Sequence, residues 1–475
     1  MIQKIISIIA IIFISLSLLA CDINLNPGQL PGRNFNLEPF ERFFDDTKKK
    51  TITIEITQQK WLELNQEMLN YHALFKDYRT DFMVEAHMIY EDNEGALSIE
   101  KIGFRTRGNV YSRQPLQNEN GELQPNHFKI SFNRNYNPIN VNRTVFELEE
   151  IDLKQNKNGD TTYITEKFSL DLFKHIGVYA AHATLVELNI KIGDENHLYG
   201  VYTAFEPIDN QFVKRRFEKA ENDGPLYKSL WQQFGPANLG YPIRNYAIGI
   251  RDEMTNYRPS YDLKTNKKTE NHDALKYFIR DINNWSDERF ITDIESLFEV
   301  DLFLRYLAVG VLLGNPDDYR AMGNNYYLYQ TSQSKKWMLI PYDYDHGLGQ
   351  GWNGEPVFTN WTVGASIYRW GNLNASMLGE PNYPHVLVDR ILRIPSYQLQ
   401  YEVYLRELIE GDFFSVDAFS AMYLQQYVLY NTSIQGALIS HSFGLRNIEW
   451  YINAKREDVL AQLTYYDEHP NERGV

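Results

Sequence analysis

Residues 301–347 read DLFLRYLAVGVLLGNPDDYRAMGNNYYLYQTSQSKKWMLIPYDYDHG. Their first part, Asp301–Leu313, is almost entirely apolar, which predicts a buried helix that ends at Gly314. Tyr326–Gln330 and Lys336–Ile340 have the length and composition of two strands joined by a short polar turn. This stretch therefore predicts a buried helix, a polar loop and a hairpin, in that order.

Acidic and amide side chains follow both the helix and the hairpin. The loop holds Asp317, Asn324 and Asn325, and the hairpin runs into Asp343 and Asp345. Asp343 and Asp345 are two residues apart, so in an extended segment their side chains share one face. Hard cations such as Mg²⁺ or Mn²⁺ prefer oxygen ligands of this kind. Either loop alone is explained by ordinary turn carboxylates, but the two together favour a metal site.

Strands are expected mainly in the first half of the chain. Alternating or strand-like segments occur at Thr51–Thr57, Phe82–Tyr90, Leu97–Arg107, Phe128–Phe132, Ala183–Ile192 and Leu198–Phe205. Thr162–Ile176 has the apolar spacing of a helix that Gly177 ends. After Asp209 the patterns are mostly helical, as in Tyr401–Ile409. The chain is therefore predicted to be α+β, with two lobes around a cleft as one arrangement.

The amino terminus has the pattern of a targeting signal. Lys4 precedes Ile5–Ala20, which contains only apolar residues and serines and is shorter than the ~20 residues that span a bilayer. The run closes with Leu18-Leu19-Ala20-Cys21, which resembles a bacterial lipobox in which Cys21 is acylated. We therefore expect a signal peptide at 1–20, a flexible tether at 21–45 and a domain at 46–465, whereas an uncleaved anchor is the alternative.

Composition excludes several classes of protein. The 475 residues carry 47 Lys and Arg against 62 Asp and Glu, a net charge of −15, which argues against a general nucleic-acid binder. Cys21 is the single cysteine, so neither an internal disulfide framework nor a cysteine zinc cage can form. The sequence contains no P-loop, no G-x-S-x-G elbow and no H-E-x-x-H motif.

The ordered set of motifs resembles the spore-coat protein H (CotH) kinase-like family. The matching segments are Arg105-Thr106-Arg107-Gly108-Asn109, Lys129 in FKISF, Glu166 in TYITEKFSLDLFKHIG, Tyr199–Asp209, Gly224–Lys228, Gly314–Asp317, Asn325–Tyr329 and Pro341–Asp345. The resemblance implies a bilobal protein-kinase-like fold. Its strand-rich N-terminal lobe is expected at 46–209 and its mainly helical C-terminal lobe at 210–465.

The same resemblance implies roles for individual residues. Lys129 is expected to contact the nucleotide phosphates and to be oriented by an ion pair with Glu166. Asp317 is expected to position or deprotonate the acceptor hydroxyl. Asn324 or Asn325, together with Asp343 or Asp345, is expected to hold Mg²⁺ that bridges the phosphates.

Further nucleotide contacts are implied for Arg107, Gly108, Asn109 and Glu206. Gly108 lets backbone amides approach phosphate oxygens because it lacks a side chain, and Arg107 adds charge-assisted bonds. Without the family pattern, Gly108 is an ordinary turn glycine and Lys129 a solvated strand lysine. Glu166 is then a first-turn helix carboxylate. The resemblance puts Glu206 on the adenine side of the cleft, and the alternative is that it caps the next helix.

The predicted function is phosphoryl transfer from a nucleoside triphosphate, with ATP as donor, to Ser or Thr of an envelope or surface protein. Lipid at Cys21 would anchor the protein to the bacterial cell envelope, outside the cytoplasmic membrane. One alternative is a catalytically silent member that serves as a surface binding or assembly module. Another is a metal-dependent phosphatase that uses Asp343 and Asp345 as a D-x-D motif, although that motif normally opens a doubly wound α/β domain.

Overall fold

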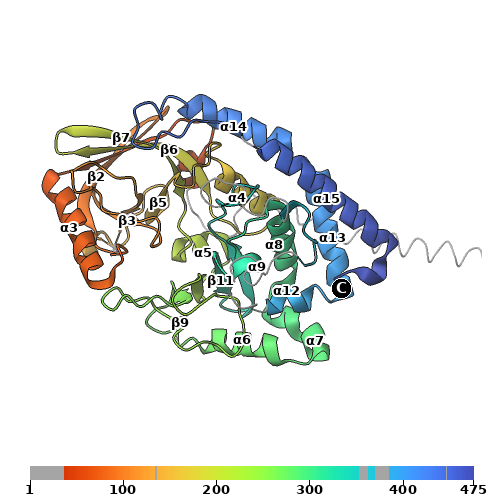
Figure 1. Ribbon diagram of the computed structural model, residues 1–475. Helices are drawn as coiled ribbons and strands as arrows, with labels where there is room; N and C mark the ends of the chain where they lie inside the picture. The colour runs from red at the N-terminus through yellow and green to blue at the C-terminus, as the bar shows by residue number, and fades with distance from the viewer. Residues whose placement is uncertain (1–36, 134–135, 352–361, 370–384, 446, 475) are drawn as a thin grey trace, which may run out of the picture.

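The computed structural model describes residues 37–133, 136–351, 362–369, 385–445 and 447–474 (Figure 1). A closed barrel forms the first part, with strand order β1-β2-β3-β4-β5-β7-β6. Neighbouring strands are antiparallel except β1 and β6, which pair in parallel and close the barrel. The strands are β1 (Thr51–Ile56), β2 (Val84–Asp92), β3 (Gly95–Arg107), β4 (His127–Ser131), β5 (Glu150–Gln155), β6 (Ala183–Ile192) and β7 (Glu195–Phe205).

Alternation of side chains explains why these segments form the barrel. In β1 the side chains of Ile52, Ile54 and Ile56 are buried, and the residues between them are half-buried. Helix α3 (Gln58–Phe75) follows directly, because the Thr57 side chain accepts a hydrogen bond from the Lys60 amide and so caps the helix. Helix α3 packs against β2, and its Trp61, Leu64 and Met68 are buried in the same hydrophobic cluster as the barrel strands.

A second sheet has the strand order β12-β11-β8-β10-β9. Its strands are β8 (Leu226–Ser229), β9 (Ile248–Gly249), β10 (Tyr261–Leu263), β11 (Tyr326–Gln330) and β12 (Trp337–Pro341). The helices that accompany both sheets are α2 (Leu37–Phe44), α4 (Thr165–His175), α5 (Asn210–Arg216), α6 (Asp273–Asn284), α7 (Asp287–Leu297), α8 (Val300–Leu313), α9 (Tyr319–Met322), α12 (Val386–Ile391), α13 (Pro395–Glu410), α14 (Val416–Tyr430) and α15 (Ile448–Glu468), with 3-10 turns η1 (Pro138–Asn140) and η3 (Pro470–Glu472).

Helix α8 is the centre of the larger hydrophobic core. Its residues are buried on almost every side, as its apolar sequence predicts, and α4, α13 and β12 pack around it. It ends at Gly314, which has a φ of +59°. A Cβ atom there would lie 2.3 Å from the Tyr451 hydroxyl, so both the backbone angle and the packing require glycine.

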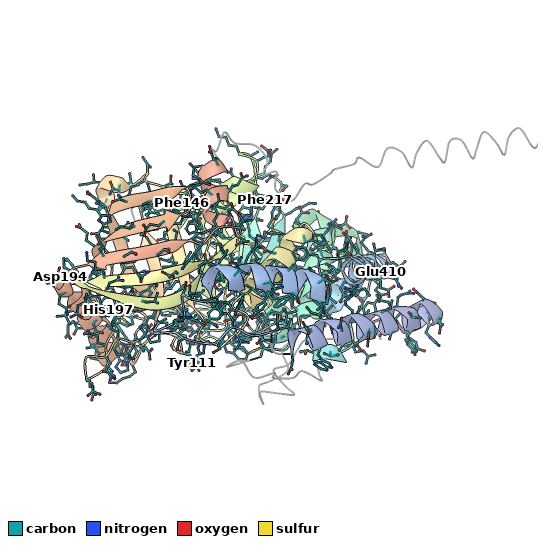
Figure 2. All side chains as sticks on the ribbon, turned by 90° about the horizontal axis from the view of Figure 1, so that it is seen from above. Tyr111, Phe146, Asp194, His197, Phe217 and Glu410 are labelled. Atoms are coloured by element: carbon teal, nitrogen blue, oxygen red, sulfur yellow. The ribbon has the colours of Figure 1, made fainter. Side chains whose placement is uncertain are left out.

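The C-terminal segment returns to the barrel. The Tyr430 hydroxyl at the end of α14 donates to the Leu185 carbonyl at 2.7 Å, and the Ile439 amide donates to the Tyr199 carbonyl at 3.1 Å. Figure 1 shows α14 reaching β6 and β7, while α15 runs on beside α13. The β6–β7 hairpin projects from the barrel, with Asp194 and His197 near its tip (Figure 2).

Most of the expected elements are confirmed, and the chain is α+β. The predicted strand at Ala183–Ile192 and the strand at Tyr326–Gln330 coincide with β6 and β11. Helix α3 and strand β5 were not predicted. Among the described residues, no helix is both long and apolar enough to cross a bilayer.

The predicted C-terminal boundary of the tether, at residue 45, is wrong. Leu37–Phe44 forms α2, whose Phe40, Phe43 and Phe44 are buried in the hydrophobic core of the barrel. These phenylalanines recur at a spacing that places them on one helix face, which explains why this segment is ordered. Cys21, the signal peptide at 1–20 and the first part of the tether lie outside the described residues.

Candidate functional site

Two loops on either side of the β11–β12 hairpin meet beside the barrel. One follows α8 and contains Asn315 and Asp317, and the other follows β12 and contains Asp343 and Asp345. The buried Asn315 side chain joins them, because its Oδ1 accepts from the Asp317 amide at 3.1 Å and its Nδ2 donates to the Asp343 carbonyl at 3.4 Å. The antiparallel pairing of β11 with β12 places both loops at the same end of the hairpin.

Lys154 lies at the centre of the acidic side chains. Its Nζ is 2.7 Å from Glu166 Oε2 and 3.0 Å from Asp345 Oδ2, and it also forms an ion pair with Asp343. The Asn158 side chain donates a further hydrogen bond to Asp345. The ammonium of Lys154 on β5 thus binds carboxylates from helix α4 and from the segment after β12.

Lys129 does not have the predicted partner. Its Nζ lies 2.6 Å from Glu150 Oε2 and 2.9 Å from Asp152 Oδ1, both on the neighbouring strand β5. The predicted ion pair between Lys129 and Glu166 is therefore wrong, and Lys154 takes that place. The strand register explains the difference, because Lys129 pairs with Asp152 and Lys154 lies two residues further along the same face.

The carboxylates of Glu166, Asp343 and Asp345, here called the acidic group, surround the ammonium of Lys154. Ligand oxygens of Glu166, Asp343 and Asp345 lie within 4.8 Å of one another. Burial raises the pKa of Glu166, and the negative charges of Asp343 and Asp345 raise it further, against the opposing effect of Lys154. The excess of negative charge and the oxygen donors fit a hard divalent cation.

Asp317 is held by the two asparagines that were expected to bind metal. Asn324 Nδ2 donates to Asp317 Oδ1 at 2.7 Å, and Asn325 Nδ2 donates to Asp317 Oδ2 at 3.0 Å. Asn324 Oδ1 accepts from the Trp231 amide at 2.6 Å. The prediction that Asn324 is a metal ligand is therefore not supported by its contacts, since both ends of its amide orient other groups.

Burial changes the acidity of Asp317. It raises the pKa of this carboxyl to about 6, and nearby Asp343 and Asp345 act in the same direction, whereas His346 and the Asn324 hydrogen bond lower it. A carboxylate with such a pKa is deprotonated at neutral pH yet remains basic enough to accept a proton. Asp317 thus has the chemistry of a general base.

Gly108 begins a tight turn rather than an open loop. It has a φ of +116°, and a Cβ atom there would lie 2.1 Å from Ser112 Oγ. The Asn109 side chain accepts hydrogen bonds from the amides of Tyr111 and Ser112 at 2.9 and 3.0 Å. The need for glycine is therefore explained by the turn itself. Arg107, just before it, lies 3.2 Å from Asp152 and donates to the Tyr342 hydroxyl at 3.0 Å.

Glu206 is not placed to contact a ligand. Its side chain is buried, Arg215 donates to its Oε1 at 2.6 Å, and Arg216 donates to its Oε2 at 2.6 Å. The backbone amide of His182 donates to Oε2 as well, at 3.1 Å. The predicted nucleotide contact at Glu206 is therefore not supported by its contacts, because both carboxylate oxygens are used in a buried ion-pair network.

A pocket of about 340 Å³ lies at the end of β5, and its lining includes none of Glu166, Asp343 and Asp345. It lies between the turn after Gly108, including Tyr111 and Ser112, and residues 155–157, which directly follow Lys154. Tyr111 is 82% exposed at its edge, and Figure 2 shows it on the outside of the molecule. A cavity of this volume is in the range that takes a small molecule.

Comparison with known proteins identifies a family. The family model described as CotH kinase protein matches residues 104–463, which includes all of the groups described above. Inner spore coat protein H of Bacillus subtilis is 25% identical over 228 residues, 47% of this chain and 56% of that protein. Invasin CotH3 of Rhizopus delemar is 23% identical over 322 residues, 65% of this chain and 45% of that protein. The chain thus spans about half the length of the curated relatives it matches.

Two solved structures were also found. The HipA–HipB–DNA complex of Shewanella oneidensis contains a chain with 13% identity and a TM-score of 0.27, covering 68% of this chain and 60% of that one. The Helicobacter pylori proinflammatory kinase CtkA has 14% identity and a TM-score of 0.24, covering 66% of this chain and 92% of that one.

Proposed function

The chain belongs to the CotH kinase protein family, and from this premise we propose that it is a bilobal, Mg²⁺-dependent kinase that transfers a phosphoryl group from a nucleoside triphosphate, such as ATP, to Ser or Thr of a protein. The single observation that carries the proposal is the ion pair of Lys154 with Glu166, made beside Asp343 and Asp345. Protein kinases use a strand lysine, a helix glutamate and a metal-binding aspartate in this combination.

Each group has a role in this reaction. Lys154 would bind phosphate oxygens while Glu166 holds its ammonium in place. Asp317 would accept the proton of the acceptor hydroxyl as its oxygen bonds to the γ-phosphorus and the bond to the nucleoside diphosphate breaks. Asn324 and Asn325 would keep both oxygens of Asp317 oriented toward that hydroxyl.

Asp343 and Asp345 are the residues that would hold the metal ion, with Glu166 as the third oxygen donor nearby. When bound, Mg²⁺ neutralises negative charge on the phosphates. The charge excess of this group supports the assignment, since three carboxylates face a single ammonium. Arg107, close to both Asp152 and Asp343, would contribute positive charge on the barrel side.

Transfer of labelled phosphate tests the proposal. Purified protein lacking residues 1–20 should incorporate label from a nucleoside triphosphate with Mg²⁺ or Mn²⁺, either into itself or into a mixture of envelope proteins. Asp343→Asn should abolish incorporation and retain the thermal unfolding midpoint within a few degrees. No incorporation from any nucleoside triphosphate, with both metals tried, would refute the proposal.

We further propose that Cys21 carries a lipid that anchors the protein to the bacterial cell envelope, so that an envelope or surface protein is the acceptor. The support is the sequence from Leu18 to Cys21. Wild-type protein should partition into the detergent phase and take up labelled palmitate, and Cys21→Ser should do neither. Palmitate uptake by Cys21→Ser would exclude this anchor.

A catalytically silent surface-binding protein is the second candidate. It is favoured by two relatives that are named invasins, of which CotH2 is 25% identical over 214 residues. This candidate expects surface binding that is the same in wild type and in Asp343→Asn. The kinase proposal expects the variant to lose phosphoryl transfer.

A further inference from the structure

A lysine of the second sheet, Lys228, lies near Asp343, one of the carboxylates proposed to hold the metal ion. Lys228 lies on β8, and its Nζ is 4.0 Å from the centre of the Tyr342 ring and 5.8 Å from that of Tyr327. Tyr342 directly precedes Asp343 in the sequence, so this ammonium contacts the residue next to a proposed metal ligand. The Tyr342 hydroxyl at the same time accepts from Arg107. Tyr342 thus contacts two cations, with Lys228 of the second sheet over its ring and Arg107 of the barrel at its hydroxyl.

Lys228 forms no ion pair with any carboxylate in the described parts of the chain. The two carboxylates whose charge acts on it, Asp152 and Asp343, are already bonded to other cations. Asp152 pairs with Lys129 at 2.9 Å and with Arg107 at 3.2 Å, and Asp343 pairs with Lys154. A partly buried ammonium without an anion is unfavourable, and burial together with Arg107 lowers the pKa of Lys228 to about 7.

Lys264 provides the contrast within the same sheet. Lys264 directly follows β10, and burial lowers its pKa to about 7 as well. Lys264 nevertheless forms an ion pair with Asp262, which stands next to Lys228 in the strand pairing. The neighbouring carboxylate is therefore used by Lys264, and none of the carboxylates in the described segments is left to pair with Lys228.

The geometry points to Lys228, on the second sheet, as a phosphate-binding residue of the nucleotide site. This inference rests on the proposed function. Aromatic contacts with Tyr342 and Tyr327 hold the side chain near Asp343, and a phosphate oxygen would supply the anionic partner that the described residues do not provide. Lys154 and Lys228 would then contact the phosphates from the barrel and from the second sheet.

Equilibrium binding of Mg²⁺–ATP, measured by calorimetry, tests the inference. Lys228→Met should weaken binding about ten- to a hundredfold, the loss expected for one hydrogen bond to a charged group. Lys228→Arg should recover most of this loss, which a purely structural role would not explain. Lys264→Met removes an equally buried positive charge and should leave the affinity within about twofold of wild type.

Adenosine serves as a probe without phosphate and should bind to wild type and to Lys228→Met with equal affinity. Unchanged Mg²⁺–ATP affinity in Lys228→Met would overturn the inference and leave the proposed function standing. Equal weakening by Lys228→Met and Lys264→Met, or no recovery by arginine, would also overturn it. If wild type binds no nucleotide at all, the proposed function fails and the inference fails with it.

Discussion

Lys154 Nζ lies 2.7 Å from Glu166 Oε2, whereas Lys129 is bonded to Glu150 and Asp152. The two lysines stand on adjacent antiparallel strands and are both largely buried, but they serve different partners. The distinction matters because the lysine beside Glu166 is also the one that contacts Asp343 and Asp345. This difference determines which of the two lysines should be needed for phosphoryl transfer.

Lys154→Met should reduce phosphoryl transfer about 10²–10³-fold, since it removes a charged donor from the site of developing charge. Lys129→Met is the matched control. It breaks a buried ion pair and should lower the free energy of unfolding by about 3–5 kcal/mol, while transfer assayed well below the unfolding midpoint persists. Label transfer and urea unfolding measure the two effects. Loss of transfer in Lys129→Met alone would restore the assignment made from sequence.

The rate should depend on the protonation of Asp317. Because burial raises the pKa of this carboxyl to about 6, kcat/KM should increase with pH through about 6 and level off above it. Asp317→Asn should lower kcat about 10²–10⁴-fold and remove this acidic limb. A pH profile of kcat/KM from pH 5 to 8 measures both. An acidic limb that persists in the residual activity of Asp317→Asn would assign the titration to another group.

Metal binding should release protons near neutral pH. Burial and the charges of Asp343 and Asp345 raise the pKa of Glu166, so its carboxyl retains protons at a pH where a free glutamate has none. A divalent cation favours the deprotonated form, and Mg²⁺ affinity should therefore rise with pH across this range. Calorimetry in two buffers of different ionisation enthalpy measures the release. Buffer-independent heats, or unchanged Mg²⁺ affinity in Asp343→Asn, would contradict the assigned ligands.

Glu206→Gln tests whether Glu206 is structural. The change leaves Arg215 and Arg216 without their shared carboxylate in a buried site and should lower the free energy of unfolding by about 3–5 kcal/mol. Urea unfolding measures this loss. Nucleotide affinity, measured at low denaturant on the folded fraction, should be unchanged. Normal stability combined with weaker nucleotide binding would favour the role predicted from sequence.

Much of the fold could be read from local pattern. The apolar run of α8, its end at Gly314 and the β11–β12 hairpin depend on neighbours in the chain, so the sequence predicts them nearly residue by residue. Strand β5 was missed because its alternation is short and charged, and Lys154 was missed with it. The buried spacing of Ile151 and Leu153 was the signal that could have found both.

The sequence by itself determined that Asp317 and Asp343 lie near each other, because a loop and a hairpin that are close in the chain bring them together. Only the tertiary structure decided which lysine joins them. That choice depends on the register of β4 against β5 and on the packing of α4, and a shift of two residues moves a side chain along the same face. It also decided that Glu206 is bound internally, because Arg215 and Arg216 both pair with its carboxylate in the folded protein.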